Sequence, residues 1–509
     1  MKLRRFAATC VAIVLLLSPL GAAAGDVKKK EEAVASIEKR KAELTRMSDQ
    51  VWAFAETALR ETRSAKLLAD YAEAQGFQVQ RGVAGMPTAF VASYGAGKPV
   101  IGIMGEFDAL PGISNKVVPE KVPLKEGAPG HGCGHHIHGT SGVAGAIAAR
   151  YAMEKAKAKG TIKFFGTPAE ENFVGKVFMV RTGLFNGVDT VISHHPDSIN
   201  AATIGTSTAV NGVKFHYYGK TSHAAGSPEQ GRSALDAIEL MNVGVNYLRE
   251  HVIQEARFHY VIEVGGGQPN VVPDYARSWY YIRAPQRDQL DSIYKRIIKI
   301  AEGAALMTET TLKVEFIMGL YNLIPNRTIA ETITANMKEI GAPQHTSEEL
   351  EFAKKINTGL DRQVKIDDMK RQKVPTWERY ADMEMADDVL DPFGEDYCSA
   401  GSTDVGDVSW VVPAVEYNTA TYPLGSPAHS WQWVACGAMG LGHKSLIFSS
   451  KVTAGTILDL LMKPELVKKA KEEHANRLTG KKYVSPIPTE IQPPLEIAKA
   501  YAEKNKGRD

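Results

Sequence analysis

The chain has 509 residues, of which 60 are lysine or arginine and 58 are aspartate or glutamate. This nearly balanced charge gives no electrostatic reason to expect nucleic acid as a partner. The length exceeds the roughly 250–300 residues that one hydrophobic core usually serves, so we expect two or more domains.

Residues 1–24 have the pattern of a secretory signal peptide. Basic residues within the first five positions precede an apolar run over residues 6–20, and the alanines at 22–24 provide a cleavage pattern before Gly25. A membrane anchor is the alternative, but the apolar run is short for a span of about 20 residues. We therefore expect a periplasmic or secreted protein. No later stretch is apolar for long enough to cross a bilayer, so no membrane span is expected after signal removal.

Strand and helix patterns alternate in the first half of the chain. Residues 26–75 have helical spacing, and the later strand-like segment PVIGIMGEFDALPG ends in a loop with Glu106 and Asp108. A helix rich in small residues then leads to the strand GTIKFFGTPAEE. Alternating strands and helices indicate an α/β fold with a largely parallel sheet, in which chemical groups gather at the carboxyl ends of strands.

The pattern changes near residue 209. Between 209 and 320 the predicted order is strand, helix, strand, strand, helix, strand, which suits a compact inserted α+β domain. The flanking segments 25–208 and 321–480 are expected to form one catalytic domain. Residues 340–397 are charged and irregular, and 481–509 form a C-terminal tail.

The stretch GHGCGHHIHGT, residues 130–140, holds four histidines and one cysteine. It offers many candidate metal ligands but lacks the second nearby cysteine of a zinc finger. Glu170 and Glu171 are adjacent at a strand end and point in opposite directions, so one could bind metal while the other faces substrate as general base. Solvated loop acids are the alternative. Single histidines that could add ligands, each more often structural when alone, are His194, His195 and His429.

Three cysteines remain after the signal, namely Cys133, Cys398 and Cys436. They are too few for a disulfide framework, although one pair could bridge. Cys133 is the one expected to stay unpaired, because a metal-bound thiolate is not available for a disulfide.

The order of several motifs resembles the M20 metallopeptidases across roughly residues 45–460. The motifs are GEFDALP, GHGCGHH, PAEE, HHP, GKTSHAAGSPEQGRSALDA, GGGQPNVVPDYA and SPAHS. The chain is most similar to the amidohydrolase branch, and GHGCGH, HP and STDVGDVSW look like its p-aminobenzoyl-glutamate hydrolase subgroup. This resemblance implies a mixed-sheet, di-metal peptidase-type catalytic domain. It also implies that residues 209–320 form a dimerisation and lid domain in a homodimer.

The resemblance further implies a site for two divalent metal ions. One thiolate, three imidazoles and one carboxylate suit zinc, with manganese or cobalt as alternatives. The implied ligands are Cys133, His135, Glu171, His195 and His429, with His194 as second choice to His195. The residues expected to surround and orient these ligands are Asp108, His136 and His138, together with His131.

The remaining site residues also come from the resemblance. Glu170 would be the general base and would then protonate the departing amine. His223 would reach across the dimer interface and stabilise the oxyanion in the partner's site. Asn270 and Arg283 would contact substrate, Arg283 by pairing with a free carboxylate, although a surface arginine is an equally good interpretation.

We therefore expect an exported metal-dependent amidohydrolase that cleaves N-acyl amino acids, p-aminobenzoyl conjugates included, by metal-activated water. A dipeptidase or carboxypeptidase of the same fold is the alternative. A non-catalytic metal- or ligand-binding protein is the third hypothesis, and Glu170 beside Glu171 argues against it, because a pure binder needs no base.

Overall fold

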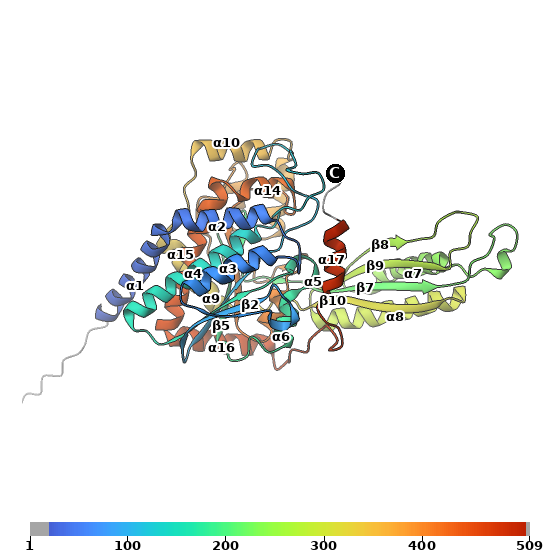
Figure 1. The fold of residues 1–509 in the computed structure, drawn as a ribbon, viewed down its shortest axis with the longest axis horizontal. Helices are drawn as coiled ribbons and strands as arrows, with labels where there is room; N and C mark the ends of the chain where they lie inside the picture. Colours follow the sequence, from blue (N-terminus) through green and yellow to red (C-terminus); the bar gives the residue numbers. More distant parts are fainter. Residues whose placement is uncertain (1–19, 505–509) are drawn as a thin grey trace, which may run out of the picture.

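The computed structural model describes residues 20–504. The predicted signal peptide lies almost entirely outside them, and only its last residues are described, at the start of helix α1 (Leu20–Lys39). Figure 1 shows a larger body of helices around a sheet, from which a smaller strand-and-helix unit extends to one side.

A six-stranded mixed sheet forms the centre of the larger body. Its strand order is β1-β2-β4-β3-β5-β12, and β4, β3, β5 and β12 run parallel while β2 is antiparallel to both β1 and β4. The expected largely parallel α/β sheet is therefore present, in mixed form. The strands are β1 (Gln78–Arg81), β2 (Phe90–Ala96), β3 (Val100–Gly105), β4 (Gly160–Gly166), β5 (Thr190–Asp197) and β12 (Ala414–Ala420).

Long helices cover one face of this sheet and enclose the main hydrophobic core. Helices α4 and α15 pack against each other, and Gly145 allows their close approach, since a Cβ there would lie 2.7 Å from Thr453. The helices of this face are α1, α2 (Lys41–Phe54), α3 (Thr62–Ala74), α4 (His135–Ala156), α9 (Arg327–Ile340), α15 (Gly440–Met462) and α16 (Pro464–Leu478).

Helix α15 is the only helix among residues 20–504 that is long and apolar enough to cross a membrane by length and composition. The expectation that no such stretch follows the signal is therefore wrong on those two criteria. Yet 89% of its most apolar window is buried inside the structure. Its apolar composition is explained by its place in the core.

The other face of the sheet carries a second core. Short helices α6 (Gly175–Arg181) and α13 (Val405–Ser409) lie there, and the C-terminal tail with α17 (Leu495–Lys504) packs against them through Ile487 and Ala498. The charged segment 340–397 is not irregular throughout. It contains α10 (Ser347–Ile356), α11 (Arg362–Arg371) and α12 (Trp377–Tyr380), and α10 begins with a capping box between Thr346 and Glu349.

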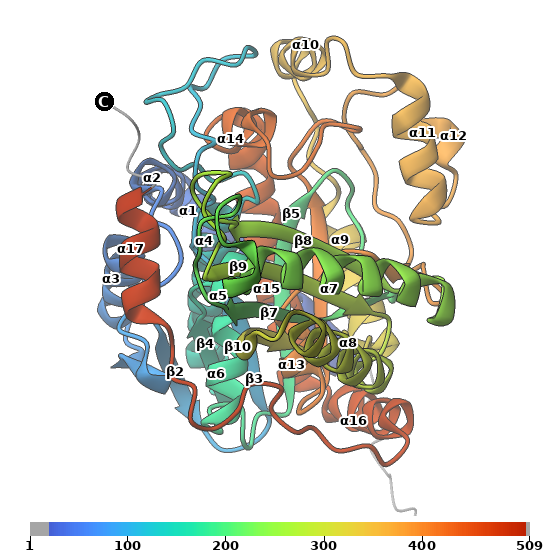
Figure 2. The same cartoon turned by 90° about the vertical axis from the view of Figure 1, so that its right-hand side faces the viewer.

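The smaller unit, which we call the lid, comprises residues 209–320. Its elements follow the predicted order and build a four-stranded antiparallel sheet, β10-β7-β9-β8, with two helices on one face and a separate core. Figure 2 shows α7 and α8 side by side in front of these strands. The elements are β7 (Ala209–Tyr218), α7 (Ala234–Leu248), β8 (Arg257–Val264), β9 (Tyr275–Ala284), α8 (Arg287–Thr308) and β10 (Thr311–Leu320).

Candidate active site

The carboxyl ends of the parallel strands bring distant segments together. Glu170 and Glu171 open the short helix α5 (Glu170–Phe173) after β4, and His195 lies near the end of β5. His429 lies in the loop between β12 and helix α14 (Trp431–Gly437), with a left-handed φ of 56°. Loops at this edge of a sheet are where α/β folds place chemistry.

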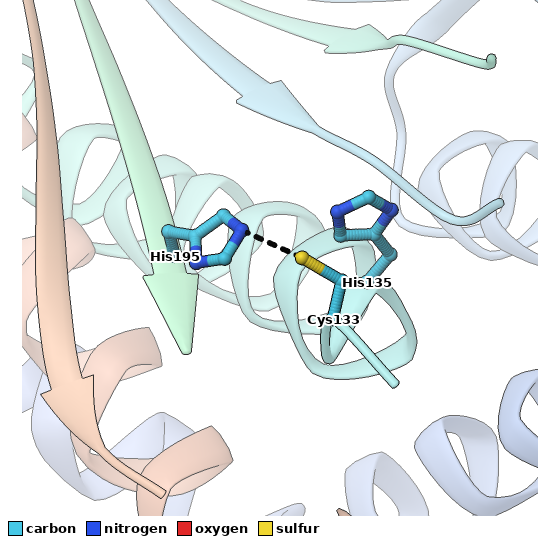
Figure 3. Close-up of side chains that lie close together, drawn as sticks. All are labelled: Cys133, His135 and His195. Carbon is cyan, nitrogen blue, oxygen red and sulfur yellow. Dashed lines mark hydrogen bonds between the residues drawn. The ribbon is translucent and has the colours of Figure 1, made fainter. Parts of the chain in front are cut away.

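Gly134 joins Cys133 to His135 at the start of α4. Its φ is 84°, and a Cβ at this position would lie 2.4 Å from the hydroxyl oxygen of Tyr422. Glycine alone suits both the left-handed backbone and the close contact. This turn brings the Cys133 thiol and the His135 imidazole within 4.8 Å of each other and of His195 (Figure 3).

Two groups of candidate ligands share the Cys133 sulfur. In the first, Cys133, His135 and His195 converge, and Sγ lies 3.3 Å from Nε2 of His195. In the second, Cys133 converges with Glu171 and His429, whose Nε2 lies 3.6 Å from a Glu171 carboxylate oxygen. The structure thus brings all five predicted ligands together, in two groups that both contain Cys133.

The atoms of these residues fit metal ions. Oε1 of Glu171 is buried without a hydrogen-bond partner in the described part of the chain. Nε2 of His135 is also buried, and its contact there is a Glu106 carboxylate oxygen at 3.1 Å. Burial and the carboxylate of Glu171 raise the pKa of the Cys133 thiol well above its ordinary value. A cation at the sulfur would reverse that shift, and sulfur with imidazole nitrogen favours zinc-like metals over magnesium.

Asp108 orients two of the candidate ligands. One of its carboxylate oxygens lies 2.9 Å from Nδ1 of His135, and the other accepts a hydrogen bond of 2.9 Å from the backbone N–H of Glu171. Because Nδ1 of His135 is engaged, Nε2, which lies 3.1 Å from a Glu106 carboxylate oxygen, is the nitrogen available to an ion. Asp108 therefore lies where the sequence predicts it.

The structure distinguishes His195 from His194. Both ring nitrogens of His194 are used in the core, at 2.9 Å from Oγ of Ser141 and 2.7 Å from Oγ1 of Thr419. In His195, Nδ1 lies 2.9 Å from the Pro196 carbonyl oxygen, which leaves Nε2 directed at Cys133. Successive residues of β5 face opposite sides of the sheet, so only His195 reaches the site.

A buried ion-pair network lies beneath the ligands. Lys176, with no exposed side-chain surface, lies 2.5 Å from carboxylate oxygens of both Glu106 and Asp404. The other Glu106 oxygen is 3.0 Å from Nδ1 of His138, whose Nε2 is 3.1 Å from Oγ of Ser193. Burial alone would raise the pKa of Glu106, but Lys176 and His138 outweigh it and hold that pKa well below the ordinary value. His138 therefore supports the site without offering a free nitrogen.

Glu170 is the candidate base beside these groups. Its carboxylate lies within 4.8 Å of ligand atoms of Glu106 and His135. Burial, followed by the carboxylates of Glu106, Glu171 and Asp404, raises the pKa of Glu170 well above its ordinary value. A carboxyl group with a raised pKa is suited to take up a proton and to hold it for return to a leaving group.

His136 does not lie beside the ligands, contrary to prediction. It follows His135 on α4 and so points about 100° away around the helix. It packs against His131, with ring centroids 5.0 Å apart, and a Cβ at Gly437 would lie 2.6 Å from its ring. His131 contacts the Val51 carbonyl oxygen, and burial lowers its pKa to about 3. Both histidines belong to the packing of α4 rather than to the site.

A cavity of about 610 Å³ opens beside the candidate ligands. Arg283 of β9 lines it and donates a 2.8 Å hydrogen bond to Oγ of Ser402. Burial lowers the pKa of the Arg283 guanidinium, and no ion pair joins this residue to an acidic side chain within residues 20–504. A desolvated guanidinium without a carboxylate partner is a candidate anion contact.

His223 and Asn270 lie elsewhere. Both are exposed, in the loops that follow β7 and β8 at the lid end farthest from the larger body (Figure 1). The Asn270 carbonyl accepts a 3.0 Å hydrogen bond from Ala224, which places Asn270 beside His223 rather than beside Arg283. Neither lines the cavity of its own chain, and their predicted roles stay predictions.

Sequence reasoning missed Lys176, Asp404 and the half-buried acid Glu416 on β12. Asp404 belongs to the motif STDVGDVSW, and Lys176 interrupts an otherwise apolar helix, but only the fold joins them to Glu106. The structure contains no disulfide among the described residues, since Cys133, Cys398 and Cys436 are all free thiols.

An α/β layer with thiol, imidazole and carboxylate groups at its strand ends defines a hydrolase of the metallopeptidase class. A family model described as "Peptidase family M20/M25/M40" matches residues 102–430. The chain belongs to peptidase family M20, and it is an enzyme of the peptidase and amidohydrolase type.

Two proteins of similar sequence agree with this assignment. The chain is 39% identical to a p-aminobenzoyl-glutamate hydrolase subunit of Escherichia coli (strain K12), over 90% of this chain and 97% of that protein. It is 30% identical to Xaa-Arg dipeptidase of Mus musculus, over 88% and 93% respectively.

Solved structures share the fold. The aminobenzoyl-glutamate utilization protein from Klebsiella pneumoniae has a TM-score of 0.55 at 17% identity, covering 84% of this chain and 96% of that one. A protein from Bacillus subtilis described as a dinuclear metal binding peptidase from the M20 family also has a TM-score of 0.55 at 17% identity, covering 83% and 99%.

Proposed function

We propose that the protein is an exported, metal-dependent amidohydrolase that releases an amino acid from an N-acyl conjugate. The observation that carries the proposal is the position of Glu170, which lies within 4.8 Å of the ligand atom of His135 and next in the chain to Glu171. The Escherichia coli relative, named as a p-aminobenzoyl-glutamate hydrolase subunit, supports the substrate class.

Cys133, His135, Glu171, His195 and His429 would hold the metal ions. The chemistry that two such ions supply when bound is activation of water and polarisation of an amide carbonyl. Glu170 accepts the proton that the attacking water loses and returns it to the departing amine nitrogen. Asp108 keeps the His135 ring and the Glu171 backbone in position during these steps.

Arg283 supplies the contact for the free carboxylate of the conjugated amino acid. Its partial burial and its lack of an acidic partner favour an anionic group from substrate. The planar guanidinium can make two parallel hydrogen bonds to that carboxylate. This contact suits N-acyl amino acids and dipeptides alike. Dipeptide hydrolysis is therefore the second candidate function, and the similarity to Xaa-Arg dipeptidase of Mus musculus supports it.

Reconstitution tests the proposed function directly. Protein depleted of metal is expected to be inactive, and zinc, manganese or cobalt is expected to restore amide cleavage, because the thiol, imidazole and carboxylate donors suit these ions. Release of the free amino acid is measured from N-acyl amino acids, p-aminobenzoyl-glutamate and dipeptides. Absence of release from every compound with every metal would contradict the proposal.

Export is tested by the mature N-terminus. Protein recovered from the periplasm or medium of an expressing cell is expected to begin at Gly25, because the small residues at 22–24 form the cleavage pattern. N-terminal sequencing measures this directly. Recovery of the intact chain from the cytoplasm alone would contradict export.

We also propose that two copies of the chain pair through their lids. Helix α7 exposes Leu240, Val243 and Tyr247, the last with 73% of its surface exposed, on one helical stripe. Strand β8 is an edge strand with Val261 and Ile262 exposed, and α7 lies on the same side of the lid. Edge strands and apolar stripes of this kind are normally covered. Because Nδ1 of His223 accepts two backbone N–H groups, its Nε2 is free for the partner's cavity.

A charged residue on this stripe is expected to separate the copies. Val243→Glu should shift the mass in light scattering from dimer to monomer and lower hydrolysis, since His223 then leaves the partner's site. Leu306→Glu is the matched control, because Leu306 is 80% exposed on α8. A purified parent chain that stays monomeric would contradict pairing of identical copies and would favour a different partner subunit.

A further inference from the structure

Glu416 presents an unused carboxyl group to the cavity. Strand β12 runs beside β5 with Glu416 opposite Ser193 and Asn418 opposite His195, so both β12 side chains share a face with His195. Both line the cavity together with Glu170. Oε2 of Glu416 is buried and has no hydrogen-bond partner among residues 20–504.

Glu416 has no cationic partner of its own among residues 20–504 to offset the burial of its carboxyl oxygen. The buried cation near it, Lys176, is already engaged by Glu106 and Asp404. Burial and the carboxylate of Glu106 raise the pKa of Glu416 to about 8 despite Lys176. A buried carboxyl oxygen with no partner is costly, so Oε2 of Glu416 calls for a partner from outside the chain.

The walls of the cavity differ in hydrogen-bonding character. The amide of Asn418 donates to Asp197, at 3.3 Å, and to the His195 carbonyl, at 3.4 Å, which leaves its oxygen as an acceptor. Glu416 and Asn418 therefore form a wall of acceptors. Arg283 contributes a donor elsewhere on the same cavity.

We propose that Glu416 receives an N–H group carried by the acyl part of the substrate, while Arg283 binds the carboxylate of the released amino acid. This inference rests on the proposed function and narrows its substrate class to amino-bearing acyl conjugates. The shared chemistry is an amino group, which either the α-ammonium of a dipeptide or the aromatic amine of an aminobenzoyl conjugate could provide.

Matched substrate pairs test the proposal on the reconstituted enzyme. Alanyl-glutamate is compared with propionyl-glutamate, and p-aminobenzoyl-glutamate with benzoyl-glutamate, so each pair differs only by the amino group. The parent is expected to prefer the amino member of one pair by about 10- to 100-fold in kcat/KM, the range of a hydrogen bond to a charged group. The preferred pair identifies the amine as aliphatic or aromatic.

Variants assign the preference to Glu416. Glu416→Leu should bring the ratio within the preferred pair close to one, because leucine offers no acceptor, and Glu416→Gln, whose amide oxygen still accepts, should keep part of it. Arg283→Gln is the control, since it should lower kcat/KM for both members and leave their ratio intact. A parent ratio near one in both pairs, or a ratio that Glu416→Leu leaves unchanged, overturns this inference alone. Absence of hydrolysis of all four compounds contradicts the proposed function and this inference with it.

Discussion

A Glu170→Gln variant is expected to bind metal like the parent and to lose hydrolysis. The loss in kcat should be about 10²- to 10⁴-fold, the contribution of a positioned general base. Glutamine has nearly the same shape as glutamate but cannot take up a proton from water. Steady-state release of the amino acid, measured with the best substrate of the panel, gives the size of the effect.

The loss must be separated from damage to the site. Glu170 is not among the five proposed ligands, so metal content per chain should be unchanged in Glu170→Gln. Glu120→Gln makes the same chemical change at an exposed position and should keep full activity. Hydrolysis by Glu170→Gln at the parent's rate would remove Glu170 from the mechanism.

The sequence predicts those parts of the site whose residues lie close together in the chain. The turn Cys133-Gly134-His135 and the pair Glu170-Glu171 each place chemical groups within a few residues, and strand ends bring such groups to one edge of a sheet. The order of elements in residues 209–320 follows equally from alternating strand and helix patterns. These features depend on local periodicity, which a single sequence displays directly.

The resemblance supplied the distant ligands His195 and His429, but local patterns alone did not predict contacts between distant residues. Lys176 and Asp404 are 228 residues apart, and neither has a local pattern that names the other. His136 was misplaced because the direction of a side chain on α4 depends on where the helix begins, and it begins at His135. The sequence TSEE fits the capping box at the start of α10. The charged composition around it nevertheless favours an irregular segment, so the helix is not predicted.

A Cys133→Ser variant is expected to lose both bound ions, whereas each of the other proposed ligands belongs to only one of the two groups that contain Cys133. Cys133 belongs to both of those groups, so its replacement removes a candidate donor from each of them. A serine hydroxyl stays protonated near neutral pH and is a poor ligand for zinc-like metals. The fall in affinity should exceed the roughly 10- to 100-fold that loss of a supporting residue costs. Metal per chain after dialysis, measured by elemental analysis, should fall together with hydrolysis.

Cys398→Ser provides the control for this prediction, because Cys398 is a free thiol outside the candidate ligand groups. It should retain the parent's metal content and activity. The replacement also distinguishes a shared sulfur from two independent sites. If Cys133→Ser kept one tightly bound ion, the remaining donors would hold that ion without sulfur, and the thiolate would serve a single metal. Retention of both ions would remove Cys133 from the centre. Loss of both, with the fold intact by circular dichroism, is the result that the geometry of Cys133 predicts.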